Sequence, residues 1–321
     1  MTTDAEAIAD RRRLRRKLSF WRVFGILALI LTVGVVGYVA ANRFGLIEGQ
    51  AHVARISVNG FISGNQRLAD LMERVGKSKS VSGVVVSINS PGGTTTGSEE
   101  LFRNIRALSA KKPLVAFVDG TAASGGYITA IAADHIVARE TSLVGSIGVL
   151  FQYPDLSGLL GQVGVKVEEV KSSPLKAEPS PFKPTSPEAR AALESVVKDT
   201  YDWFKRIVRE RRGMSEGELA AASTGQIFSG HQGVPMKLVD AIGAERDAVA
   251  WLEREKAIRK DLPIRDWKPR SDRDFSLFAW AATGADLFGL DGVGEAFRRA
   301  AASAEAAQLD GLLAVWHPSE K

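Results

Sequence analysis

Apolar and polar residues follow two periods along the first half of the chain. Short runs of β-branched and aliphatic residues predict strands at 53–58, 83–88, 114–118 and 136–138. Apolar residues at helical spacing predict helices between these strands, at 68–75, 98–108 and 124–133. The run at 83–88 is apolar enough to be buried on both faces of a sheet. Strands and helices in alternation indicate an α/β domain with a largely parallel sheet.

The second half of the chain has a more helical pattern. After a proline-rich stretch, residues 187–212 predict a long amphipathic helix, and further helices follow to about residue 258. Residues 274–299 place large apolar side chains among alanines and glycines. We expect that last segment to pack in the core or against another subunit. A position on the membrane surface and a flexible tail near an active site remain alternatives.

One apolar stretch is long enough to cross a membrane. Residues 23–41 contain no charged side chain, and about 20 such residues span a bilayer core. Seven Lys and Arg residues precede this stretch and Arg43 follows it, which by the positive-inside rule places the N-terminus in the cytoplasm. A cleaved signal peptide is the main alternative, and a buried soluble helix is another. The predicted organisation is a basic tail at 1–22, an anchor at 23–41, a catalytic domain at 45–258 and a helical or flexible extension at 259–321.

Composition excludes several classes of function. The chain has no cysteine, so it has no disulfide and no thiolate nucleophile. Its four histidines are scattered along the sequence and form no metal-binding motif, and we expect neither a metal nor a cofactor. The net charge of +5 comes mostly from the basic tail, so we expect no nucleic-acid partner.

Candidate chemistry follows two of the predicted strands. Asn89-Ser90-Pro91-Gly92-Gly93 comes after the strand at 83–88, and the glycines of such a turn let backbone N–H groups face a ligand. Ser124 follows the next strand and begins a helix, where free N–H groups favour developing negative charge. The structural alternatives are a strand-to-helix turn whose glycines only relieve strain, and a serine that only caps the helix. His135 would lie about 15 Å from Ser124 along that helix, at 1.5 Å per residue, which argues against a Ser-His-Asp triad.

Three motifs in order carry a family resemblance. They are Asn-Ser-Pro-Gly-Gly at 89–93, Ala-Ala-Ser-Gly-Gly-Tyr at 122–127 and Val-Gly-Ser-Ile-Gly-Val at 144–149, with a further match at 224–243. Together they resemble the short, single-repeat form of the signal peptide peptidase A family. The resemblance implies a Clp protease/crotonase-like core and a membrane-anchored serine endopeptidase of the bacterial inner membrane, with its catalytic domain in the periplasm.

The resemblance also implies the roles of individual residues. Ser124 takes the place of the nucleophile, and Ser146 that of the serine that orients the general base. The base is a lysine within 170–176, for which the motif favours Lys176 and leaves Lys171 as the alternative, because Ser173 and Pro174 depart from the family pattern. The backbone N–H groups of Gly93 and Gly125 would hold the oxyanion.

The resemblance and the glycine-rich turns together predict the substrates. An extended peptide would add as a strand, and the residues expected to bind it are Gly92, Thr94, Gly126, Ile147 and Gly148. The expected partners are signal peptides and unfolded membrane-protein segments, membrane lipid, and further copies of the chain in a homo-oligomeric ring. A catalytically silent membrane scaffold and an acyl-CoA enzyme of the crotonase type remain the alternatives.

Overall fold

The chain forms two compact units, Met1–Gln50 and Ala51–Lys321, in a computed structural model that describes residues 17, 19–31, 33–34, 50–269 and 313–315. In the first unit, residues 19–31, 33 and 34 are helical, and their large apolar side chains are exposed. Among the described residues, no helix has both the length and the hydropathy to cross a bilayer. The predicted anchor at 23–41 extends over 35–41, which lie outside the described part of the chain.

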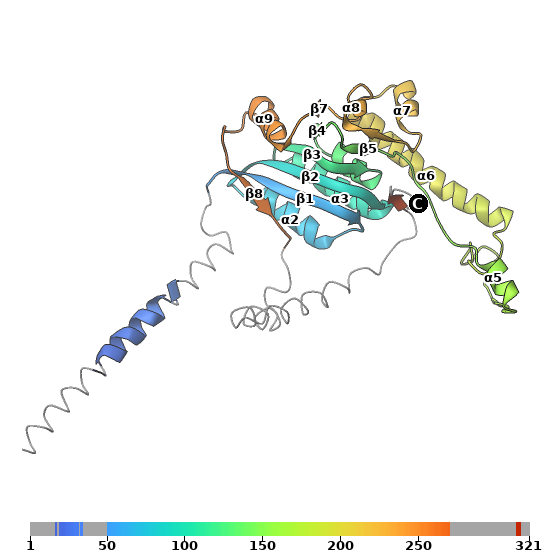
Figure 1. Ribbon diagram of the computed structural model, residues 1–321, viewed down its shortest axis with the longest axis horizontal. Coiled ribbons are helices and arrows are strands. Elements are labelled where there is room, and N and C mark those ends of the chain that lie inside the picture. The colour runs from blue at the N-terminus through green and yellow to red at the C-terminus, as the bar shows by residue number, and fades with distance from the viewer. Residues whose placement is uncertain (1–16, 18, 32, 35–49, 270–312, 316–321) are drawn as a thin grey trace, which may run out of the picture. The chain divides into compact units, whose positions relative to one another are not determined.

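The second unit is built on a mixed, mostly parallel sheet (Figure 1). The main path runs β6-β5-β3-β2-β1-β8, and β4, β7 and β9 join its sides. The strands are β1 (His52–Ile62), β2 (Val81–Thr94), β3 (Leu114–Ala123), β4 (Ile136–Ala138), β5 (Leu143–Gly145), β6 (Ile227–Ser229), β7 (Ala241–Ile242), β8 (Ile264–Trp267) and β9 (Leu313–Val315). Only the β5–β6 and β2–β9 pairs are antiparallel within the described residues. The predicted α/β class with a largely parallel sheet is confirmed.

Helices cover both faces of this sheet. They are α2 (Gln66–Lys77), α3 (Thr95–Ser109), α4 (Gly125–Ile131), α5 (Ser157–Gln162), α6 (Pro187–Arg212), α7 (Glu216–Ala222), α8 (Gly230–Gly233) and α9 (Glu245–Glu255). Val84 and Val86 of β2 belong to the core under α2, α3 and α4, whereas Val85 packs with Leu252 of α9 on the other face. Figure 1 shows α2 and α9 on opposite sides of the sheet. Residues 83–88 are therefore covered on both faces, as their apolar run predicts.

The long predicted helix at 187–212 is confirmed as α6, and its ends follow local rules. Ser186 caps the N-terminus by accepting the Ala189 N–H, and Pro187 occupies the first turn, where no N–H is needed. Gly213 ends the helix in the left-handed region at φ 58°.

Two segments that lie between a predicted strand and a predicted helix are strand instead. Gly92 and Gly93 continue β2 and pair with Phe61 and Ile62 of β1. Residues 121–123 continue β3 and pair with β5. Strand pairing uses backbone N–H and C=O groups, so it can continue through glycines and polar residues. The side-chain pattern of these segments therefore does not indicate that they are strands.

The extension expected at 259–321 also contains strands. β8 adds to the edge of β1 in parallel, where Arg55 binds Asp266 at 2.9 Å and the Trp267 indole donates to His52 at 3.0 Å. Without β8, the outer edge of β1 would have unpaired N–H and C=O groups, and β8 pairs with those of Val53–Ile56. The amphipathic segment 274–299 lies outside the described residues.

Candidate active site

Ser124 occupies the corner between β3 and α4. Its backbone has φ 53° and ψ −114°, a conformation that residues with a side chain rarely adopt, and its N–H donates to the Gly145 carbonyl at 2.8 Å. Ser124 is 1% exposed, and every residue of α4 is buried. Strain of this kind persists only where the surrounding structure enforces it, and it is concentrated at functional sites.

The Ser124 hydroxyl is not used for helix capping. Ser124 stands at the N-cap position of α4, yet its side chain makes no capping hydrogen bond. The hydroxyl instead lies 3.5 Å from the Gly148 carbonyl oxygen, a long contact. The first N–H groups of α4, beginning with Gly125, have no partner within the helix. A helix-capping role therefore does not account for Ser124.

Two glycines allow backbones to approach closely around this corner. A Cβ on Gly126 would lie 2.5 Å from the Ser90 carbonyl oxygen, so only glycine lets α4 pass the end of β2. A Cβ on Gly93 would lie 1.8 Å from the Ile62 carbonyl oxygen of β1. Ser90 also pairs with Ala122, two residues before Ser124. The predicted oxyanion glycines, Gly93 on β2 and Gly125 at the start of α4, thus lie on elements that pack around the Ser124 corner.

The predicted orienting serine lies on the loop after β5. Ser146 has φ 51°, is 8% exposed, and donates its N–H to the Gln226 carbonyl at 2.7 Å. Ile147 is fully buried, and Gly148 provides the carbonyl oxygen that the Ser124 hydroxyl contacts. The structure therefore brings the loop at 145–148 to Ser124, through the Gly145 and Gly148 carbonyls.

The end of β2 pairs with the C-terminal strand of the same chain. β9 runs antiparallel to it, with Leu313 opposite Thr94, Ala314 opposite Gly93 and Val315 opposite Gly92. The Thr94 side chain caps α3 by accepting the Gly97 N–H at 3.1 Å, so only its backbone is available to a bound strand.

Lys176 lies apart from Ser124, in a segment with little burial. From residue 150 to residue 179 no residue is fully buried, and Figure 1 shows α5 extending beyond the sheet. We call residues 150–179 the arm. The Lys176 side chain is exposed and makes no hydrogen bond or ion pair with any residue that the structure describes. The structure thus brings Ser124, Ser146 and the glycines together, and it leaves Lys176 outside this group.

Lys171, the alternative base, is held by carboxylates. Its amine lies 2.8 Å from Glu169 and 2.7 Å from Glu178. Hydrogen bonds to Glu169 and then Glu178 raise the pKa of the Lys171 amine above its ordinary value. A general base needs the opposite shift.

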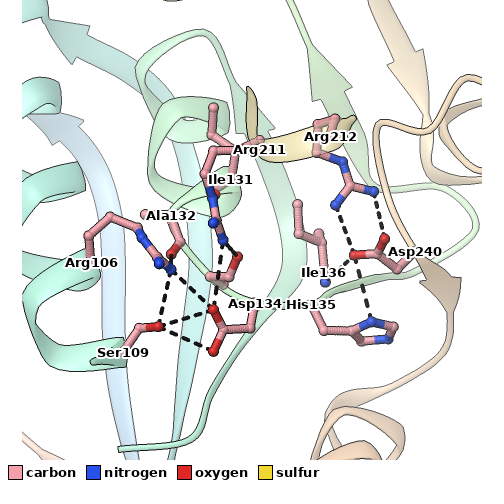
Figure 2. A network of polar contacts seen from close by, with 11 residues as sticks. Arg106, Ser109, Ile131, Ala132, Asp134, His135, Ile136, Arg211, Arg212 and Asp240 are labelled. Carbon is pink, nitrogen blue, oxygen red and sulfur yellow. Dashed lines mark hydrogen bonds and ion pairs between the residues drawn. The ribbon is translucent and has the colours of Figure 1, made fainter. Parts of the chain in front are cut away.

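A polar network that the sequence analysis missed anchors the far end of α4 (Figure 2). Arg211 of α6 donates to the Ile131 carbonyl at 2.8 Å and to the Ala133 carbonyl at 2.7 Å. Arg106 of α3 donates to the Ala132 carbonyl at 3.0 Å. These carbonyls are the ones that a helix C-terminus leaves without partners. The signal in the sequence was weak, because arginines in amphipathic helices usually face solvent.

The same network holds the strand that follows. Asp240 accepts the Ile136 N–H at 2.7 Å and binds Arg212 at 2.7 Å. His135 lies 3.7 Å from Asp240 and stacks on Trp251 with ring centroids 4.5 Å apart. His135 is therefore part of this packing, in agreement with its exclusion from the catalytic group.

Comparisons with known proteins identify the family. Residues 106–259 match Peptidase family S49. A candidate protease of Synechocystis is 34% identical over 74% of this chain and 88% of its own length. A candidate signal peptide peptidase of Enterococcus faecium is 32% identical over 70% of this chain and 69% of its own. The chain belongs to peptidase family S49, and the predicted resemblance is confirmed.

Other relatives match over a smaller part of their length. A candidate protease of Methanocaldococcus jannaschii is 38% identical over 58% of this chain, and the match spans 60% of that protein. Among solved structures, a ClpP1 mutant from Listeria monocytogenes aligns with 61% of this chain and 94% of its own at a TM-score of 0.40 and 16% identity.

Proposed function

We propose that the protein is a membrane-anchored serine endopeptidase in which Ser124 is the nucleophile and Lys176 the general base. The observation that carries the proposal is the buried Ser124 at a strained strand-to-helix corner, with a hydroxyl that caps nothing. Membership of family S49 supports peptide hydrolysis as the reaction. Its substrates would be extended apolar peptides, such as signal peptides left after secretion.

The reaction divides into two acyl transfers. The neutral Lys176 amine takes the Ser124 proton as the hydroxyl oxygen attacks a peptide carbonyl, and it then protonates the leaving amine. Water, deprotonated by the same amine, hydrolyses the acyl-enzyme and regenerates the serine. The N–H groups of Gly93 and Gly125 would hold the oxyanion in both steps.

The exposed arm supports an assembly in which one subunit supplies the base to the next. Large apolar side chains of the arm are exposed: Leu150, Leu156, Leu159, Val163, Val165, Val167, Val170 and Leu175. Exposed apolar surface of this extent marks a contact surface. In a homo-oligomeric ring, packing of the arm on a neighbour would bury Lys176, and burial without a paired carboxylate favours a neutral amine.

Mixed oligomers test this arrangement. Ser124→Ala and Lys176→Ala subunits, each inactive alone, are coexpressed with different tags and the mixed species purified. About a quarter of the wild-type activity is expected from random mixing in a closed ring, because a quarter of sites combine an intact serine with a neighbour's intact lysine. Absence of activity would place both residues in one subunit. Labelling of wild type but not Ser124→Ala by a serine-reactive phosphonate separates a peptidase from a silent scaffold.

The backbone of β2 supports strand addition as the mode of substrate binding. β9 already pairs antiparallel with Gly92, Gly93 and Thr94, so this edge accepts an extended segment. The loop at Ile147 and Gly148 would line the other side of the bound peptide, and Gly126 would leave room for its backbone.

The N-terminal unit supports membrane attachment. Its helical residues expose Phe24, Leu27 and Leu31, and seven basic residues lie within 1–22. We place this unit in the bacterial inner membrane with its N-terminus in the cytoplasm and the catalytic unit in the periplasm. A reporter that is active only outside the cytoplasm, fused after Lys321, should give a signal. A signal from a cytoplasm-specific reporter would contradict this topology.

A further inference from the structure

Four charged side chains close the loop that carries Lys176. Lys171 lies 2.8 Å from Glu169 and 2.7 Å from Glu178. Lys183 lies 3.3 Å from Glu169 and 2.5 Å from Glu178. Each amine is therefore shared by both carboxylates, and the two positive charges balance the two negative ones.

Glu178 is the most buried member of this cluster. Its side chain is 6% exposed, and its second carboxylate oxygen accepts the Ser180 N–H at 3.2 Å. The Lys171 side chain is 15% exposed, whereas Lys176, between these two positions, is an exposed residue. The ion pair between residues 171 and 178 thus ties the two ends of the loop and leaves Lys176 on its outer side.

The cluster also occupies the carboxylates closest to Lys176 in sequence. Lys176 is two residues from Glu178, and it makes no ion pair with any of the residues described. A carboxylate paired with a lysine amine favours the protonated form and opposes its action as a base. The remaining acidic side chain lining the 720 Å³ cavity of this cluster is Glu188, at the start of α6.

We propose that Lys171, Lys183 and Glu178 are positioning residues, which close the Lys176 loop and keep both glutamates of the loop away from the Lys176 amine. This role rests on the proposed function, because it requires Lys176 to be the base. Hydrogen bonds from Lys171 and then Lys183 hold the pKa of Glu178 at about 2, so this carboxylate is ionised at neutral pH.

The pH dependence of kcat/KM tests the proposal on the full chain. In Lys171→Gln, Lys183 alone is left to bind both carboxylates, so Glu178 gains an oxygen that can pair with Lys176. We expect the acidic limb of the profile to move up by about one pH unit. Activity at neutral pH then falls about tenfold, with KM and the high-pH plateau unchanged. Lys171→Gln/Glu178→Gln should return the limb to its wild-type position, and Lys171→Arg, which keeps the ion pairs, should not move it. Lys166→Gln, an exposed lysine on the same arm, is the matched control.

The outcomes separate this inference from the proposed function. A Lys171→Gln profile that superimposes on the wild type, or a double variant that stays shifted, would overturn the role of the cluster. Loss of Lys171→Gln activity at every pH, with Lys171→Arg also inactive, would make Lys171 itself the base and overturn it too. An active Lys176→Ala enzyme would instead disprove the proposed function.

Discussion

The two residues of the proposed dyad lie in opposite environments. Ser124 is 1% exposed at a corner where β2, β3 and β5 meet α4, and the backbone of each element is tied to the next. Lys176 lies on the arm, where no residue from 150 to 179 is fully buried. The core of one chain therefore determines the geometry of the nucleophile. The proposed base instead lies on a segment that the core of the described chain leaves unburied.

The largest expected effect is loss of activity when either residue is removed. Ser124→Ala and Lys176→Ala should each lower kcat/KM by at least about 1,000-fold, because groups that act as a unit lose most of their rate together. Measured on a fluorogenic peptide, Lys171→Ala should remain far more active than Lys176→Ala. Near-normal turnover by Lys176→Ala would disprove the choice of base.

Replacing a glycine should lower the free energy of unfolding at the Ser124 corner but not on the arm. Gly126→Ala would place a methyl group 2.5 Å from the Ser90 carbonyl oxygen and should cost about 1–3 kcal/mol, with loss of activity. Gly158→Ala, in α5 of the arm, meets no atom within 4 Å and should be neutral or slightly stabilising. Chemical denaturation measures both, and equal effects would show that the corner is not tightly packed.

On α6, Arg211, which binds the end of α4, should contribute more to stability and activity than the exposed Arg209. Arg211→Ala leaves the Ile131 and Ala133 carbonyls without their donor, and we expect about 2 kcal/mol lower stability and a reduced kcat. Arg209→Ala removes an exposed ion pair with Glu216 and should cost less than about 1 kcal/mol. A kcat unchanged in Arg211→Ala would show that Ser124 does not depend on this end of α4.

Removal of the C-terminal strand tests access to the end of β2. A chain ending at residue 312 lacks β9, which pairs with Gly92–Thr94. We expect its KM for an extended peptide to fall about threefold, because a competing strand is gone. A chain ending at residue 315 keeps β9 and should behave as the wild type. A KM that rises on removal would mean that β9 helps to form the site.

The smallest effect concerns pH. Burial lowers the pKa of His135 from its ordinary 6.5, with Asp240 opposing this shift. The unfolded chain then binds more protons than the folded one below about pH 6.5, so stability falls as the pH is lowered from 7 toward 5. Melting temperatures across this range should show a weaker dependence in His135→Gln and an unchanged one in the exposed His231→Gln. If the melting temperature of His135→Gln depends on pH as strongly as that of the wild type, His135 is not the cause of the pH dependence.

The local pattern of apolar residues predicted most helices and strands, but it did not predict how far the strands extend. The helix at 187–212 and the strand at 136–138 were predicted with their observed bounds, because apolar periodicity and capping residues act locally. The extension of β2 through Gly92 and Gly93 could not be predicted, since it depends on pairing with Phe61 and Ile62, which lie 31 residues earlier in the chain.

The sequence by itself determined the fold class, the family and the candidates Ser124 and Lys176, because periodicity and motif order are properties of the chain. Only the tertiary structure decided which candidates meet. It placed residues 145–148 against Ser124, whose N–H donates to Gly145 and whose hydroxyl contacts Gly148, and it supplied Arg211 and Arg106 to the end of α4. It also left Lys176 exposed and gave Lys171 two carboxylate partners. Such contacts join residues far apart in sequence, and burial, which sets the chemistry of a lysine, exists only after the chain has folded.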